Sequence, residues 1–170
     1  YLLEKASIRA IEVSIANVGI IFNGISLLLY IIGLQVAGGH PTGVEITSYG
    51  LLLDRDYPRL IGLLDDPNIF IFYNALFFSF YLTHLKGMKH SIGFILSVIT
   101  SLLTFSRGGI VALILVVLLY MLLANFSKKV KMMTLSLLCL VGLYTSGSYL
   151  QIDFNQIIYS RINDFTTDGG

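Results

Sequence analysis

The stretch from Val13 to Ala37 limits the possible folds of this chain more than any other feature. It contains no charged residue and is bounded by Glu12 and by a Gly-Gly-His-Pro run at residues 38–41. About 20 apolar residues are enough to cross the hydrocarbon core of a bilayer. We therefore expect a membrane-spanning helix here. Because Asn17 and Asn23 are polar, we expect both to face other helices and not lipid.

The composition extends this expectation to the whole chain. Hydrophobic residues make up 55% of the 170 residues, charged residues 12%, and the mean hydropathy is +0.80. A soluble domain carries roughly 25% charged residues. These values predict an integral membrane protein. The single cysteine, Cys139, lies in an apolar run and has no second cysteine for a disulfide or a metal site.

Four further apolar stretches predict an all-α fold, a polytopic transmembrane bundle of about five spans. We treat residues 1–170 as one membrane domain and, because the chain starts at Tyr1 and ends in a polar stretch, we expect a piece of a longer protein. The third span is the least clearly defined, since its apolar part ends at Phe105 and is slightly short. The expected spans are about residues 13–37, 69–85, 91–107, 110–126 and 132–150, with outer loops at 38–68 and 151–170.

The cations divide between the two sides of this bundle. Seven of them fall on one side if there are five spans: Lys5, Arg9, Lys86, Lys89, Lys128, Lys129 and Lys131. Cytoplasmic loops carry the excess of Lys and Arg, so this side is predicted to be cytoplasmic. The opposite side receives only arginines: Arg55, Arg59, Arg107 and Arg161. The planar guanidinium fork suits two-point binding of phosphate or carboxylate.

The longest polar interruption, residues 54–68, lies on this all-arginine side. It holds six charged residues: Asp54, Arg55, Asp56, Arg59, Asp65 and Asp66. Asp66 before Pro67 and Asn68 is a typical start of a helix, with Asp66 as N-cap and Pro67 as the first helical residue. The free N–H groups of such a helix start can also bind an anion. Pro58, just before Arg59, could begin a short helix on the membrane surface.

A second polar motif, Thr104-Phe105-Ser106-Arg107-Gly108-Gly109, is expected at the outer end of the third span. An Arg at membrane depth is costly unless it reaches the surface, pairs or faces a polar cavity, so Arg107 is a candidate functional residue. Snorkelling to the surface is the alternative. The two glycines are expected to form the joint to the next span and would allow a bound group to approach the backbone closely.

Other polar residues are weaker candidates. His40 is a possible base, although a lone His in a turn is usually only polar. His84 and His90 are expected near the inner boundary as interface residues. No cluster of Cys and His with metal spacing, Gly-rich phosphate loop or Gly-x-Ser-x-Gly motif occurs in the sequence.

Three short motifs, in this order and spacing, resemble the core of the O-antigen ligase and O-antigen polymerase family. They are Arg59-Leu60-Ile61-Gly62, Asp66-Pro67-Asn68 at the start of a span, and Thr104-x-Ser106-Arg107-Gly108-Gly109 two spans later. The similarity covers about residues 57–110, and the segment around Arg161 resembles the family's next periplasmic segment.

The resemblance implies a bacterial glycosyltransferase of the cytoplasmic membrane, multi-pass and active on its extracytoplasmic side. Such enzymes transfer a glycan from an undecaprenyl diphosphate carrier to a growing surface polysaccharide or to another acceptor glycan or lipid. The implied partners are the carrier-linked glycan, the acceptor and membrane lipids, with no nucleic acid. No cofactor, metal or nucleotide sugar is implied. A polymerase is favoured, since nothing in the sequence points to a lipid A acceptor.

Carried over to this chain, the resemblance places Arg59 and Arg107 at the carrier diphosphate. Around them it places Asn68, Ser106, Gly108 and Arg161. Asp66 and Asn68 match a pair whose role in the family is architectural. The ligases use a His in a later outer loop as the general base, and we expect that loop beyond residue 170. Within the chain the weak catalytic candidates are His40, Asp65 and Asp66.

Two alternatives remain open from the sequence. A membrane transporter or channel for an anionic solute would also need outer arginines, although it often shows duplicated halves or broken helices, and neither is seen here. A non-catalytic membrane scaffold would tolerate replacement of those arginines by glutamine.

Overall fold

The structure is a computed structural model that describes residues 2–37, 46–53, 57–85, 87–150 and the single positions Asn155 and Tyr159. It is largely helical, as expected. The helices are α1 (Leu2–Ala37), α2 (Pro67–Thr83), α3 (Gly87–Leu103), α4 (Arg107–Leu123) and α5 (Phe126–Leu150). Three short strands lie between α1 and α2: β1 (Ile46–Ser48), β2 (Leu51–Leu53) and β3 (Arg59–Leu60).

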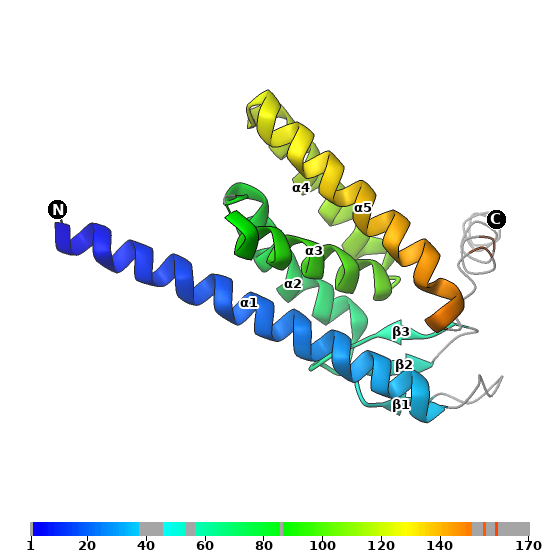
Figure 1. Cartoon of the computed structure of the whole chain (residues 1–170). Helices are drawn as coiled ribbons and strands as arrows, with labels where there is room; N and C mark the ends of the chain where they lie inside the picture. The colour runs from blue at the N-terminus through cyan, green and yellow to red at the C-terminus, as the bar shows by residue number, and fades with distance from the viewer. Residues whose placement is uncertain are drawn as a thin grey trace.

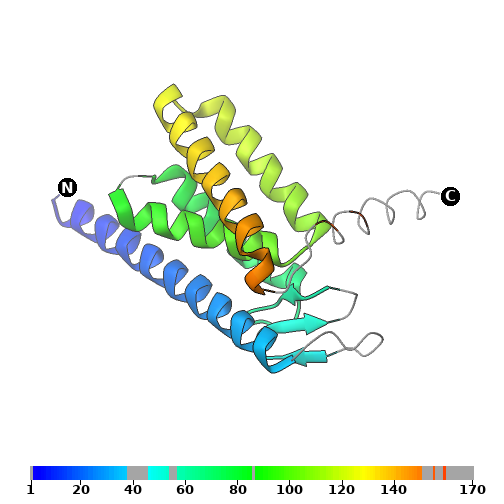
Figure 2. The same ribbon diagram turned by 45° about the vertical axis from the view of Figure 1, so that its right-hand side comes forward.

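Helix α3 is the centre of the bundle. It packs against α1, α2 and α5 and, less extensively, α4, while α2 also packs against α1 and α4. The first turns of α1 extend well beyond the other helices (Figure 1). The strands lie together at the opposite end of α1, next to the start of α2 (Figures 1 and 2). We call this the sheet end of the bundle.

The strands form an antiparallel sheet in the order β1-β2-β3, which the sequence did not predict. Tyr49 and Gly50 connect β1 to β2 with φ of 45° and 75°. Positive φ at both residues is typical of the two-residue turn that matches the twist of a hairpin. The short surface helix expected after Pro58 is wrong, because Arg59 and Leu60 pair with Leu52 and Leu51.

The expected joint at Gly108-Gly109 is also wrong. Helix α3 ends at Leu103, and α4 begins at Arg107, so Arg107 starts a helix where the sequence placed it at the end of one. The connection is the Thr104–Ser106 turn, which Phe105 makes with φ of 49°. Both glycines lie in the first turn of α4. A serine cap explains this start, because it satisfies a free N–H of the helix.

Two apolar clusters fill the bundle, and a layer of polar side chains separates them. The cluster at the sheet end includes Tyr30, Leu60, Phe70 and Leu103. The cluster at the other end includes Ala16, Phe78, Tyr81 and Phe94. Along α1, α2 and α3, the positions between the clusters hold fully buried polar residues: Asn23, Ser26, Asn74, Ser97, Thr100 and Ser101. This layer joins three helices at mid-height.

Hydrogen bonds connect the residues of the polar layer except Ser26, whose buried hydroxyl has no hydrogen-bond partner among the described residues. The Asn74 side-chain amide donates to Ser97 O (2.9 Å), Thr100 Oγ1 (3.1 Å) and Ser101 Oγ (2.8 Å). Thr100 Oγ1 donates to Asn23 Oδ1 (2.5 Å). The expectation that Asn23 faces other helices is therefore confirmed. The same expectation is wrong for Asn17, which is exposed.

Among the described residues, only α1 has a segment, Ser7–Ala37, that is both long and apolar enough to cross a membrane by length and composition. Helices α3 and α4 are apolar but have 17 residues each, at the lower limit of about 17–25 residues for a span. Helix α4 has no buried residue. Its outward aliphatic side chains are strongly exposed, among them Leu118 at 55% and Leu122 at 79%.

Candidate functional site

The start of α2 is built as the sequence predicts. Asp66 is the N-cap: its Oδ1 accepts hydrogen bonds from the backbone N–H groups of Asn68 (2.7 Å) and Ile69 (3.0 Å). Pro67 is the first helical residue. Because these contacts satisfy two of the backbone N–H groups that the helix start leaves free, and Pro67 has no N–H to satisfy, Asp66 has a structural role here. Asp65, the residue before it, is exposed.

The start of α4 is capped by Ser106. Its hydroxyl oxygen accepts a hydrogen bond from the Gly109 backbone N–H (3.2 Å), and the serine is 2% exposed. Arg107 follows as the first helical residue and is partly buried. The helix dipole places about half a positive charge at such an end. The guanidinium of Arg107 adds a full charge to the same end.

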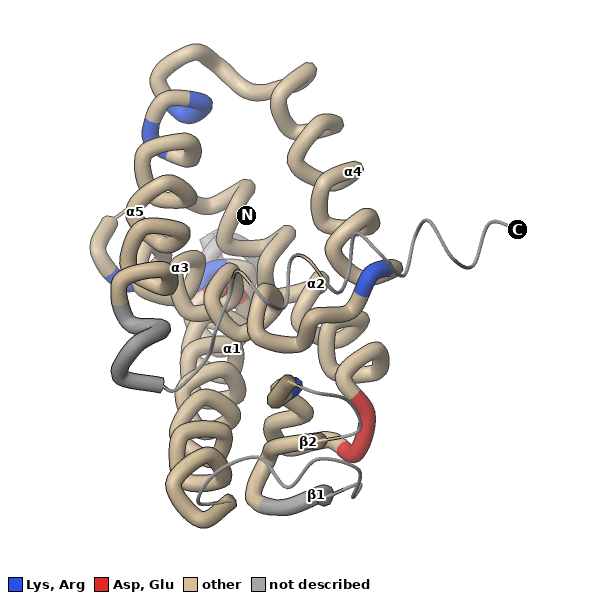
Figure 3. Tube along the Cα trace, turned by 90° about the vertical axis from the view of Figure 1, so that its right-hand side faces the viewer, with Lys and Arg blue, Asp and Glu red and all other residues tan. Residues whose placement is uncertain are grey.

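A side-chain hydrogen bond joins the two helix starts. Ser106 Oγ donates to Asn68 Oδ1 at 2.7 Å, although the two residues are 38 positions apart. Close approach of the helices depends on Gly109, where a Cβ atom would overlap the Ile71 side chain. The two motifs that the sequence placed on one side are therefore in direct contact. Figure 3 shows the basic start of α4 and the acidic residues before α2 at this end.

Arg59 is connected to the same turn from the sheet. It is 7% exposed, and its Nε donates to the backbone O of Thr104 at 3.1 Å. A cation at the last carbonyls of α3 also interacts favourably with the negative end of that helix. Thr104 Oγ1 in turn accepts a hydrogen bond from the Ser106 N–H (3.2 Å). Arg59 thus helps to hold the turn that carries Ser106 and Arg107.

A groove of about 280 Å³ runs between α2 and α4 from this turn. Its walls are largely apolar and include Ile71, Phe72, Ala75 and Ala112. Asn68 and Ser106 provide polar atoms at one end, next to Gly108, where a Cβ atom would meet nothing within 4 Å. The groove therefore has a polar end and an apolar body, which suits an amphiphile better than a fully hydrated anion.

Most of the predicted site residues are brought together. Hydrogen bonds or direct chain neighbours link Arg59, Asn68, Ser106, Arg107 and Gly108 at the sheet end. Two candidates, His40 and Arg161, lie outside the described residues. The sequence assigned no role to Thr104, which connects Arg59 to Ser106. The signal for it was its place in the Thr104-x-Ser106-Arg107-Gly108-Gly109 motif, two residues before the capping serine.

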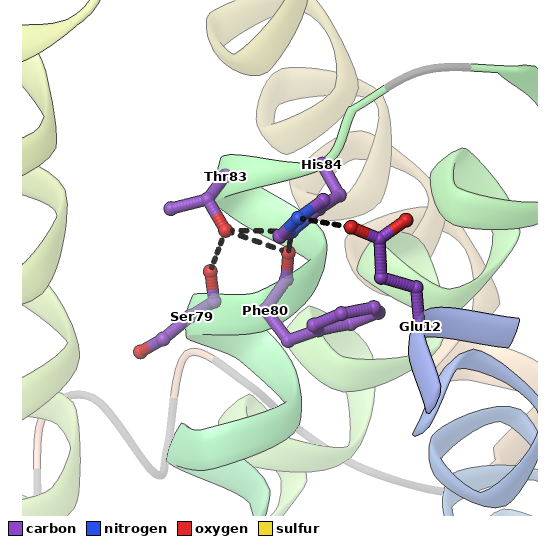
Figure 4. A network of polar contacts seen from close by, with 5 residues as sticks. All are labelled: Glu12, Ser79, Phe80, Thr83 and His84. Atoms are coloured by element: carbon purple, nitrogen blue, oxygen red, sulfur yellow. Dashed lines mark hydrogen bonds and ion pairs between the residues drawn. The ribbon is translucent and has the colours of Figure 1, made fainter. Parts of the chain in front are cut away.

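At the other end of the bundle, His84 makes structural contacts (Figure 4). Its Nδ1 lies 2.9 Å from Phe80 O, and its Nε2 lies 3.7 Å from Glu12 Oε1 on α1. The His84 and Glu12 side chains are 41% and 45% exposed, so the ion pair that forms on protonation contributes at most about 1 kcal/mol. Among the described residues, no group of three His, Cys, Asp or Glu side chains could hold a metal ion.

The cations of the described chain are segregated along the bundle. Arg59 and Arg107 lie at the sheet end. At the opposite end, Lys89 lies in the first turn of α3 and three lysines lie in the first turns of α5. Figure 3 shows the basic residues of α5 far from the start of α4. No family model, curated protein or solved structure matches the chain.

Proposed function

We propose that this chain belongs to a bacterial membrane glycosyltransferase that transfers glycan from an undecaprenyl diphosphate carrier to a growing surface polysaccharide or other acceptor, of the O-antigen polymerase or ligase type. The observation that carries the proposal is the junction of two helix starts, Asn68–Ser106, with Arg59 and Arg107 beside it at one end of an apolar bundle. Helix N-termini and guanidinium groups are the donors that proteins use for phosphate.

Five membrane crossings in the bacterial cytoplasmic membrane are part of this proposal. A 17-residue helix is about 25 Å long, close to the roughly 30 Å of the hydrocarbon core. The exposed aliphatic side chains of α4, for example Leu118 and Leu122, would face lipid. Lysines at the opposite end favour the cytoplasm for that end, which puts the sheet end on the extracytoplasmic side.

In the proposed reaction an acceptor hydroxyl attacks the anomeric carbon of the carrier-linked sugar. The carbon–oxygen bond to the diphosphate breaks, the diphosphate leaves with the bonding electron pair, and the hydroxyl proton passes to a general base. Arg107 and the positive end of the α4 dipole would stabilise the negative charge that develops on the diphosphate. Arg59, through Thr104, would hold the turn in position.

The α2–α4 groove favours a lipid-linked phosphate over a free anion. Its polar end contains Asn68 and Ser106, and its body is lined by Ile71, Phe72 and Ala75. A diphosphate at the polar end would leave the attached isoprenoid chain against the apolar walls. A small hydrated anion in transit would gain no binding free energy from contact with these apolar walls. The groove thus supports the enzyme over the transporter.

The test uses the intact protein in a strain that lacks the corresponding gene. Arg107→Gln removes a charge from a partly exposed helix start, and Ser106→Ala breaks the contact with Asn68. Arg9→Gln, on an exposed residue at the other end, is the matched control. We expect both site variants to lose long-chain polysaccharide on a gel at normal protein level, while the control keeps the wild-type ladder.

An unchanged chain-length ladder in Arg107→Gln, with normal amounts of protein in the membrane, would show that the arginine does not serve this reaction. Reconstituted vesicles provide a second test. Anion flux without turnover of a carrier-linked glycan would support the transporter and contradict the enzyme. A scaffold predicts that neither quantity changes when Arg107 is replaced.

A further inference from the structure

A second cavity, separate from the α2–α4 groove, lies between α1, α3 and α5. Its volume is about 500 Å³. Aliphatic side chains of all three helices line it, and Leu27, Ile99 and Leu138 are representative. On α5, Gly142 contributes no side chain to the lining, and a Cβ atom at this position would meet nothing within 4 Å. The cavity is therefore a hollow in the packing between α1 and α5, with α3 as its floor.

The lining provides little for a polar ligand to bind. Tyr30 is the one lining residue with a phenol, and its hydroxyl donates to Pro58 O (3.4 Å) in the segment before β3. Cys139, also in the lining, is buried. Cavities with apolar walls stay dry and take up apolar molecules. Water is therefore a poor occupant, and a hydrocarbon is a good one.

The length of the cavity indicates which kind of apolar molecule fits it. On α3 it reaches from Ile95 to Leu103, the last residue of the helix at the sheet end. Eight residues of helix correspond to about 12 Å. Half of the hydrocarbon core of a bilayer is roughly 15 Å thick. The cavity thus runs from the sheet end to mid-bundle, a distance that matches one leaflet.

A further helix does not fit into this space. One turn of α-helix, about 10–12 Å across and 5.4 Å high, occupies roughly 400–600 Å³. The cavity of about 500 Å³ would hold a single turn, whereas a spanning helix has more than five. A hydrocarbon chain is thinner and flexible and needs no partner for a polar backbone.

We propose that the α1–α3–α5 cavity binds one hydrocarbon chain of a lipid from the leaflet at the sheet end. The headgroup would lie beyond Leu103, near the strands, and the chain would run along Ile99 toward mid-bundle. This inference rests on the membrane setting proposed above and is independent of glycosyl transfer. The lipid fills the space that Gly142 leaves open and connects α1 to α5 through its own contacts.

The test is photocrosslinking in nanodiscs that contain a phosphatidylcholine with a diazirine in one acyl chain. The intact protein is reconstituted and irradiated, and the modified peptides are mapped by mass spectrometry. In wild type we expect strong labelling around Leu138–Leu143 on α5 that saturates at one lipid per protein. Gly142→Leu, which places a side chain in the path of the hydrocarbon chain, is expected to reduce this labelling at least tenfold.

Controls separate the bound lipid from the lipid that surrounds every membrane protein. Gly24→Leu adds the same side chain on α1 at a position with equal open space that lines neither cavity, and it should label like wild type. Labelling of Leu118 on α4 should not saturate. If Gly142→Leu misfolds, as judged by elution volume and circular dichroism, Ile99→Phe narrows the cavity from the opposite wall.

Equal labelling of the α5 peptide in wild type and in a correctly folded cavity-filling variant would overturn the proposal. So would labelling of this peptide that rises with lipid concentration as it does at Leu118. Failure of the protein to enter nanodiscs would instead contradict the membrane setting itself. Loss of glycan transfer in Arg107→Gln has no bearing on the result, which keeps the two proposals distinguishable.

Discussion

Replacing Gly93 with alanine is expected to force α2 and α3 apart, because the added methyl group would overlap the ring of Tyr81. A Cβ atom at Gly93 would lie more than about 1 Å inside the ~3.5–4.0 Å separation that carbon atoms prefer, against both Cε1 and Cζ. The ring cannot retreat easily. It is fully buried, and its hydroxyl donates to Ala16 O on α1 at 2.7 Å.

The expected magnitude follows from three contributions. Overpacking of a tight core costs about 1–3 kcal/mol. Loss of the Tyr81–Ala16 hydrogen bond adds about 0.5–1.5 kcal/mol. The higher helix propensity of alanine compared with glycine stabilises the folded state by up to about 1 kcal/mol. We therefore expect Gly93→Ala to lower the free energy of unfolding by about 0.5–4.5 kcal/mol.

Gly24→Ala is the matched control, since a Cβ atom there meets nothing within 4 Å. This variant has only the higher helix propensity of alanine and no overlap, so it should be neutral or stabilising by up to about 1 kcal/mol. Unfolding by dodecyl sulfate in mixed micelles, followed by far-ultraviolet circular dichroism, measures both variants. Equal stability of the two alanine variants would refute the overlap with Tyr81. In a Tyr81→Leu background, the cost of Gly93→Ala should largely disappear.

Two further predictions concern the polar layer and the sheet end. Asn74→Leu removes the hydrogen bonds to Ser97, Thr100 and Ser101. At about 0.6 kcal/mol per interhelical bond, the same unfolding assay should show a free energy of unfolding that is about 1–2 kcal/mol lower. The control Asn17→Leu, at an exposed position, should leave the free energy of unfolding unchanged. Gly62→Ala should destabilise the sheet end, because Gly62 has φ of 60° and a Cβ atom would lie 2.5 Å from Ser26 Oγ. We expect faster proteolysis between β3 and α2 in this variant. An unchanged cleavage rate would contradict the prediction.

The helices could be predicted from the sequence because apolar stretches and a cap define them locally. Asp66 and Pro67 mark the start of α2 without any tertiary information. The start of α4 was misplaced because Gly108-Gly109 is typical of a joint, whereas capping by Ser106 lets both glycines enter the helix. The sheet was not predicted from the sequence because β3 has two residues and β2 only three. Strands that short show no periodicity.

The site could be predicted in part for a topological reason. Two helices, α2 and α3, separate the start of α2 from the start of α4, so both starts lie at one end of the bundle. That the hydroxyl of Ser106 reaches Asn68, and that Arg59 reaches Thr104, depends on how the helices slide and rotate against one another. Residue type alone also does not determine which polar side chains of a helix are buried. Asn23 is buried and Asn17 is exposed on the same helix.

The contact between Arg59 and Thr104 imposes an order on biogenesis. Arg59 leaves the ribosome 45 residues before Thr104, a delay of roughly 2–9 s at 5–20 residues per second. A buried guanidinium without its acceptor is costly, so the segment that carries it must stay hydrated until the end of α3 arrives. We therefore expect Arg59 on β3 to reach its final position only after the end of α3 has been synthesised. A nascent chain stalled before residue 104 should therefore expose this segment to an added protease, and the full-length chain should protect it.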